Sequence, residues 1–172
     1  MTTTTAIPSL AARAAQYQAE AEALVKQAKE DQLTPAGAYN AHARSLAWGR
    51  SKAGDPMLTL EAVTEGESQH IFFDRAGLWS SPRGRSMGIL ALHAFNTAFG
   101  LPPGALLAQA QALAAGEMTV EEATAELGDV EAIHFNVEVT HKDKKVTDPA
   151  TNEVKTETEA QYAYAPYRYI PS

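Results

Sequence analysis

Residues 56–100, PMLTLEAVTEGESQHIFFDRAGLWSSPRGRSMGILALHAFNTAFG, decide the fold that this sequence predicts. Apolar and polar residues alternate over 57–63, which is the period-two pattern of a half-buried strand; the residues on its apolar face are Leu58, Leu60 and Ala62. A turn at 65–68 leads into a second, aromatic run from His70 to Phe73. The stretch therefore begins as two antiparallel strands.

The second half of the stretch predicts a basic loop and then a helix. The loop covers 79–85 and contains one tryptophan and two arginines. An apolar helix is expected from Met87 to Phe99, ending at Gly100, because glycine suits the left-handed position after a helix. Two paired strands that lead into one apolar helix form the middle of several small β-barrels.

Three further strands are expected outside this stretch. The first covers 39–48, with Asn40, His42, Arg44, Leu46 and Trp48 on one face and Tyr39, Ala41, Ala43, Ser45 and Ala47 on the other. Residues 132–141 alternate strongly, with Ile133, Phe135, Val137 and Val139 inward. Residues 154–164 alternate again, so that the last two strands make a long hairpin with a charged tip.

A long helix is expected before the strands, because residues 10–32 lack Gly and Pro and Ser9 can cap them. Its apolar and alanine positions form a heptad seam: Leu10, Ala14, Tyr17, Ala21, Leu24 and Ala28. The seam either packs on the rest of the chain or joins another copy. The expected organisation is thus a tail and helix in 1–32 and a domain in 33–172 that contains a helical insert at 103–128.

The predicted fold class is mainly β with added helices. A helix between the third and fourth of five strands is the order of the OB-fold, a five-stranded barrel that binds oligonucleotides or oligosaccharides. In this interpretation the long N-terminal helix and the helical insert before the fourth strand are additions to the barrel.

Composition limits the chemistry. The 172 residues include no cysteine, which excludes disulfides and thiolate metal sites and favours a cytoplasmic location. No apolar run approaches the ~20 residues of a membrane span, so no membrane partner is expected. The net charge is −7, but residues 101–131 hold six acidic and no basic side chains, which leaves the predicted barrel nearly neutral.

Aromatic and basic side chains mix in three places, as binding of single-stranded nucleic acid requires. The first strand and its turn carry Arg44, Trp48, Arg50 and Lys52. The third strand and following loop carry Phe72, Arg75, Trp79, Arg83 and Arg85. The final hairpin and C-terminus carry Lys142, Lys144, Lys145, Tyr162, Tyr164 and Arg168. The hypothesis requires these rings and cations to share one exposed trough.

Structural alternatives accompany each candidate. Only one of Phe72 and Phe73 can face outward, and Trp48 can instead plug a barrel end. Tyr162 and Tyr164 share a face, so both belong to the core if that face points inward. The lysines near 142–145 can simply be a solvated hairpin tip.

Enzymatic and metal-dependent functions are not expected. The five histidines show no metal-ligand spacing along the chain, and there is no G-x-S-x-G motif and no P-loop. The sequence therefore predicts no catalysis, no cofactor and no metal.

Several segments together resemble phage-encoded single-stranded DNA-binding proteins with an OB-fold. They are TPAGAY at 34–39, residues 58–66, the phenylalanine strand, HAFNTAFGLP at 93–102 and ELG at 126–128 before the strand 133–139. The helical insert is longer than in that family, and the C-terminus is aromatic where many members have an acidic tail. The resemblance implies sequence-independent coating of single strands in phage DNA replication or recombination.

A second hypothesis makes the chain a protein-interaction or virion-structural module. In that case the N-terminal helix forms a homo-oligomer through residues 10–28, and DNA is not a partner.

Overall fold

The computed structural model describes residues 9–31 and 33–171. Residues 1–8 of the predicted N-terminal tail, and Gln32 at the expected helix end, lie outside the described residues. The chain divides into two compact units: Thr34–Lys142 with Ala160–Ser172, and Met1–Leu33 with Asp143–Glu159. The outer part of the last hairpin therefore belongs to the same unit as the N-terminal helix. The division expected from the sequence, between residues 32 and 33, instead placed the whole hairpin with the strands.

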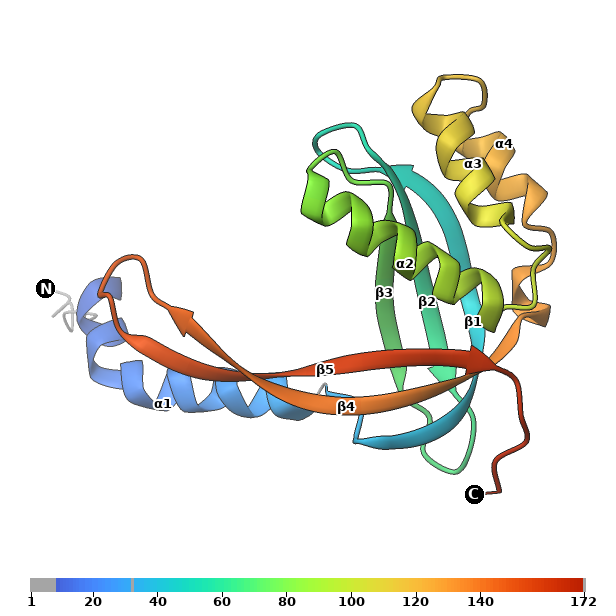
Figure 1. The fold of residues 1–172 in the computed structure, drawn as a ribbon. Coiled ribbons are helices and arrows are strands. Elements are labelled where there is room, and N and C mark those ends of the chain that lie inside the picture. The colour runs from blue at the N-terminus through green and yellow to red at the C-terminus, as the bar shows by residue number, and fades with distance from the viewer. Residues whose placement is uncertain (1–8, 32, 172) are drawn as a thin grey trace, which may run out of the picture. The chain divides into compact units, whose positions relative to one another are not determined.

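The larger unit is built on a five-stranded antiparallel sheet, and the last two strands continue from it into the smaller unit (Figure 1). Its strands are β1 (Gly37–Arg50), β2 (Pro56–Thr64), β3 (Ile71–Gly77), β4 (His134–Thr147) and β5 (Val154–Pro166), in the order β3-β2-β1-β4-β5. All five predicted strands are present, although β4 continues six residues further than expected. The mainly β class is confirmed.

A β-bulge interrupts β1. Ala43 pairs with Ala62 and Ser45 with Glu61, so Arg44 is an extra residue on the β1 side. An extra residue reverses the alternation of all side chains that follow it. Ala41 and Ala43 point inward before the bulge, and Leu46 and Trp48 point inward after it. The predicted single face carrying both Arg44 and Trp48 is therefore wrong.

Helix α2 (Pro82–Ala98) lies across β1, β2 and β3 and covers their inner face (Figure 1). Its buried Leu92, Phe95 and Ala98 meet the apolar side chains of the sheet. The helix begins five residues before the predicted start, because Ser81 caps it and accepts a hydrogen bond from the Gly84 amide at 3.2 Å. The predicted basic loop is thus largely the first turn of α2.

The predicted insert consists of two helices, α3 (Ala105–Ala114) and α4 (Val120–Glu126), followed by a 3₁₀ turn at Val130–Ala132. Thr119 caps α4, with the Glu122 amide donating to its hydroxyl at 3.2 Å. The insert joins the end of β1, where the Trp48 amide donates to the Thr124 hydroxyl at 3.0 Å. Its helices therefore close one end of the sheet's core.

The two edge strands, β3 and β5, meet through side chains. The rings of Phe72 and Tyr162 stack with centroids 4.6 Å apart. The Tyr164 hydroxyl donates a 2.6 Å hydrogen bond to the Asp74 carboxylate. Within the described residues, β3 and β5 are not neighbours in the sheet and are not joined by backbone hydrogen bonds as paired strands. The sheet is open in its hydrogen bonding, and aromatic side chains bridge its edges.

The smaller unit contains α1 (Leu10–Asp31) and the outer part of the hairpin. Ser9 caps α1 as predicted, accepting from the Ala12 amide at 3.2 Å. The heptad-seam side chains of α1 are exposed, Leu24 by 66%. At the hairpin tip, the Asp148 amide donates to the Glu153 carbonyl at 2.8 Å. Within 9–31 and 33–171, no helix has the length and apolarity to cross a bilayer.

Candidate nucleic-acid interface

Of the two tryptophans predicted to stack on bases, Trp48 is buried and Trp79 is half-buried. Trp48 is only 5% exposed, and its indole N–H donates to the Gln109 side chain at 2.8 Å. The bulge in β1 turns it inward. Trp79 is half-buried, because its ring lies against Gly77, where an added Cβ would stand 2.6 Å from the ring. Trp48 is therefore removed from the candidate interface, and Trp79 offers only part of its ring.

The structure resolves the choice between the adjacent phenylalanines. Phe72, which the sequence assigned to the interface, is 3% exposed and belongs to the core. Phe73 points to the opposite face and is 62% exposed. The assignment of Phe72 is corrected, since its inward ring stacks on Tyr162 and is inaccessible to a ligand.

The predicted stacking tyrosines, Tyr162 and Tyr164, also face inward. Both pack against the hydrophobic core, and Tyr164 contacts Phe95 edge-on with ring centroids 4.9 Å apart. Burial raises the pKa of both phenols, and the charge of Asp74 raises the pKa of Tyr164 further. These rings close the gap between β3 and β5, so they leave the candidate interface.

The predicted cations lie on several surfaces. Arg83 and Arg85 are exposed in the first turn of α2, and Lys52 is exposed in the β1–β2 loop. The Arg50 guanidinium donates to the carbonyls of Gly54 and Leu113, both at 3.1 Å.

Along the hairpin, the exposed lysines belong to two different units: Lys142 to the larger unit, and Lys144 and Lys145 to the smaller unit. Within the described residues of the larger unit, the inward rings of Trp48, Phe72, Tyr162 and Tyr164 leave no exposed trough of the expected composition.

A smaller surface remains on the outer face of β1, β2 and β3, which we call the outer face. Ile71, Phe73 and Arg75 alternate outward along β3, and Ile71 is 48% exposed. Phe73 pairs across the strands with Glu61, whose carboxylate lies 3.7 Å from the Arg44 guanidinium. Of the predicted site residues, Arg44 and Arg75 are thus brought beside an exposed ring.

The C-terminal segment borders the outer face on the β4 side. The Asn40 side chain exchanges two hydrogen bonds with the backbone of Ile170, at 3.0 and 3.2 Å. The neighbouring Asn136 accepts from the Arg168 amide at 3.0 Å. These contacts hold residues 168–170 against an Asn pair of β1 and β4. Arg168 is therefore anchored through its backbone, with an exposed side chain.

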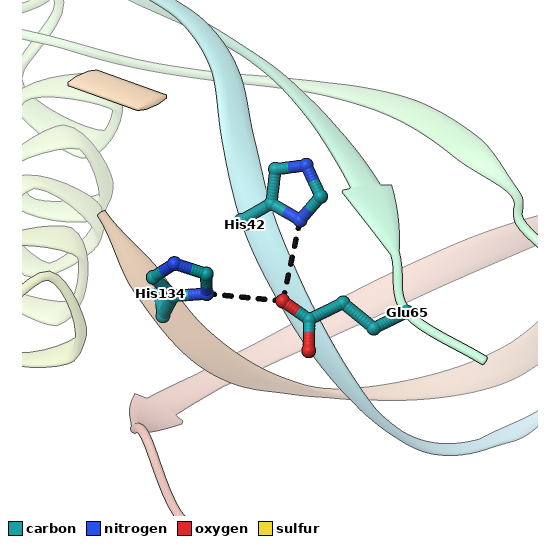
Figure 2. Close-up of side chains that lie close together, drawn as sticks. All are labelled: His42, Glu65 and His134. Atoms are coloured by element: carbon teal, nitrogen blue, oxygen red, sulfur yellow. Dashed lines mark hydrogen bonds and ion pairs between the residues drawn. The ribbon is translucent and has the colours of Figure 1, made fainter. Parts of the chain in front are cut away.

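At the border of the outer face, His42, Glu65 and His134 form a cluster that the sequence did not predict (Figure 2). The Nδ1 atoms of His42 and His134 lie 3.3 and 3.0 Å from the same Oε1 of Glu65. The three ligand-type atoms all lie within 4.8 Å of one another. An open groove connects this cluster with Arg44 and Ile71.

Sequence reasoning missed this cluster because it searched for spacing along one segment. His42 and His134 are separated along the chain and become direct partners only when β1 pairs with β4. The only signal in the sequence was that His42 and His134 both take the outward position of their alternating strands. The sequence predicted that either Phe72 or Phe73 faces outward. Which of the two does so depends on the turn before β3, because that turn decides whether the odd- or the even-numbered residues of the strand point inward.

No protein-family model matches this sequence, and no curated protein shows detectable similarity to it.

Proposed function

We propose that the chain binds single-stranded DNA without sequence preference, through the outer face of β1, β2 and β3. The observation that carries the proposal is the exposed ring of Phe73, set between Ile71 and Arg75 along β3. A large aromatic ring held in water by a rigid strand gives a nucleobase a flat surface on which to stack. One stacked base contributes roughly 1–3 kcal/mol.

Arg44 and Arg75 supply the charge that follows a phosphate backbone. Arg44 stands on the bulge, and its side chain remains half exposed beside Glu61. Arg75 is two residues from Phe73 and is exposed. Because only two cations flank the ring and Glu61 offsets one of them, stacking should outweigh the electrostatic contribution. Binding should therefore have a shallow salt dependence.

The arrangement of the sheet supports an OB-type barrel as the scaffold of this function. Helix α2 lies between β3 and β4 in the chain, as the central helix of that fold does. The aromatic contacts between β3 and β5 join the strands that such a barrel brings together. In this proposal the protein coats single strands during phage DNA replication or recombination, as the sequence resemblance implies.

Fluorescence anisotropy of a labelled oligo-dT tests the proposal, with titrations at about 50 and 200 mM salt. The native protein should bind at low salt. If Arg44 and Arg75 each neutralise one phosphate, log K should fall against log salt with a slope of about −1.4. The double variant Arg44→Ala/Arg75→Ala should flatten that slope, since it removes both contacts.

A matched control removes two positive charges elsewhere. Arg13 and Lys26 lie exposed on α1, so the Arg13→Ala/Lys26→Ala variant has the same net charge as the outer-face variant. It should retain native affinity and slope. The absence of binding at low salt, or an equal loss in both variants, would show that the outer face does not bind DNA.

The exposed seam of α1 favours a second candidate, assembly with another copy of the chain. Leu10 is 85% exposed and Tyr17 is 51% exposed, which is unusual for apolar side chains at heptad positions. Light scattering of the native protein and of Leu24→Glu tests this candidate. A defined oligomer that dissociates in the variant supports it, and a monomer in both cases refutes it.

A further inference from the structure

We propose that His42, Glu65 and His134 form a binding site for a transition-metal dication, with Zn²⁺ as the best fit. His42 lies in β1, His134 lies in β4 and Glu65 directly follows β2, and all three side chains point toward one spot (Figure 2). Two imidazoles and one carboxylate are a common ligand set for Zn²⁺. The proposal does not depend on DNA binding.

Two of the three distances between ligand atoms are close to those of a tetrahedral metal site, and all three atoms lie within 4.8 Å of one another. Zn–N and Zn–O bonds of about 2.0–2.2 Å in a tetrahedron place neighbouring ligand atoms about 3.3–3.6 Å apart. The two histidine nitrogens lie 3.3 and 3.0 Å from the Glu65 oxygen. An ion at the centre therefore needs shifts of only a few tenths of an ångström along these two edges.

The ligands stand on elements that hold them in place. His42 and His134 are direct cross-strand partners, and the adjacent Ala43 amide donates to the Ile133 carbonyl at 3.0 Å. The Glu65 amide donates to the Asn40 carbonyl at 2.7 Å, which fixes the carboxylate's backbone next to β1. A site on paired strands loses little conformational freedom when it binds an ion.

The ligand chemistry and the groove define the ion. Imidazole nitrogens favour Zn²⁺, Co²⁺, Ni²⁺ and Cu²⁺ over Mg²⁺ and Ca²⁺, which prefer oxygen ligands. His134 is about half exposed, and the cluster borders an open groove that also contains Glu131. Three protein ligands facing an open groove leave a fourth position for water or an incoming group.

A simpler interpretation is that the two histidines only hydrogen-bond to Glu65. Such a cluster needs no ion and would not concentrate one. The two interpretations differ in a measurable quantity, the affinity for Zn²⁺.

Competition between the tag-free full-length protein and a chromophoric chelator measures that affinity. We expect one equivalent of Zn²⁺ to bind and millimolar Mg²⁺ not to displace it. Loss of a hydrogen-bond partner of a zinc ligand weakens binding about 10–100-fold, so loss of a ligand itself should weaken it at least about 100-fold. The variants are His42→Ala, Glu65→Gln and His134→Ala.

Two control variants test specificity. His93→Ala removes an exposed histidine from α2, and Glu61→Gln removes a carboxylate from the same groove. Both should bind Zn²⁺ as the native protein does. Far-UV circular dichroism in chelator must show that each variant is folded, and His42→Asn and His134→Asn replace any alanine variant that is not.

Co²⁺ provides an independent spectroscopic readout. Its visible absorption bands should appear with the native protein and disappear with the His134 variant. No Zn²⁺ uptake by the native protein, or uptake that the three ligand variants leave unchanged, would overturn the proposal. Zn²⁺ binding without DNA binding would sustain this site while refuting the proposed function.

Discussion

Replacing Phe72 and Phe73 separately by alanine is the sharpest test of the outer face. The two side chains are adjacent, have the same chemistry and lie on opposite sides of β3. Each variant is thus the other's matched control. The structure predicts that one change reduces stability and the other reduces DNA binding.

The stability difference follows from burial. Phe72 is 3% exposed and stacks on Tyr162, so its truncation should cost about 3–5 kcal/mol in the free energy of unfolding. Phe73 is 62% exposed, and its truncation should cost about 0.5 kcal/mol or less. For a chain of 172 residues, 1 kcal/mol shifts Tm by about 2–4 °C. Phe72→Ala should therefore lower Tm by about 6–20 °C, and Phe73→Ala by about 2 °C at most.

The affinity difference should run in the opposite direction. Phe73→Ala removes a stacking surface worth roughly 1–3 kcal/mol, which corresponds to about 5–150-fold weaker binding of oligo-dT. Phe72→Ala leaves the outer face intact and should bind normally at temperatures well below its Tm. The expected loss for Phe73→Ala is the same at both salt concentrations, because stacking releases no counterions.

Thermal melts followed by circular dichroism and anisotropy titrations at 10–15 °C below the lower Tm measure both quantities. A larger loss of stability in Phe73→Ala than in Phe72→Ala would mean that Phe73, and not Phe72, faces the core. Unchanged affinity in Phe73→Ala, with native binding otherwise present, would refute the role of the exposed ring while leaving the fold intact.

Gly88→Ala should lower the free energy of unfolding by several kcal/mol, because the new Cβ would stand 1.8 Å from the Gly77 carbonyl oxygen. The control Gly100→Ala, at φ +67° in open space, should lower it by only about 1 kcal/mol. Equal urea midpoints for the two variants would contradict this prediction. Burial raises the pKa of Tyr164 in the folded state, so the unfolded chain loses this proton first, near pH 10. The contribution of Tyr164 to the free energy of unfolding should therefore be complete below about pH 10 and decrease above it. Urea titrations between about pH 9 and 11 should show a smaller decrease for Tyr164→Phe than for the native protein. Free Zn²⁺ at about 100 times its Kd should stabilise the native protein by about 2.7 kcal/mol and leave the His134→Ala melt unchanged.

Local alternation predicted much of the sheet. Leu58, Leu60 and Ala62 are buried as expected, and so are Phe135 and Val137 in β4. These strands have one apolar face, and a one-residue shift would expose it. The number of strands was predicted for the same reason.

The candidate site was harder to predict because it depends on local exceptions. One extra residue at Arg44 separates that side chain from Trp48, and nothing in the composition of β1 marks the bulge. The start of α2 had a signal that was not used, since Ser81 followed by Pro82 is a typical N-cap and first helical residue. The pairing of His42 with His134 exists only after the strands assemble.

The side-chain bridge between β3 and β5 affects which changes in sequence length the fold can accept during evolution. A ladder of backbone hydrogen bonds ties two strands to one residue-by-residue alignment, whereas stacked rings such as Phe72 on Tyr162 fix only a spacing. In the part of the chain that the structure describes, no backbone ladder joins β3 and β5, so only the β4–β5 ladder holds β5 in register. Changes in chain length should therefore be tolerated better at the β3–β5 joint than within the hydrogen-bonded run from β3 through β2, β1 and β4 to β5.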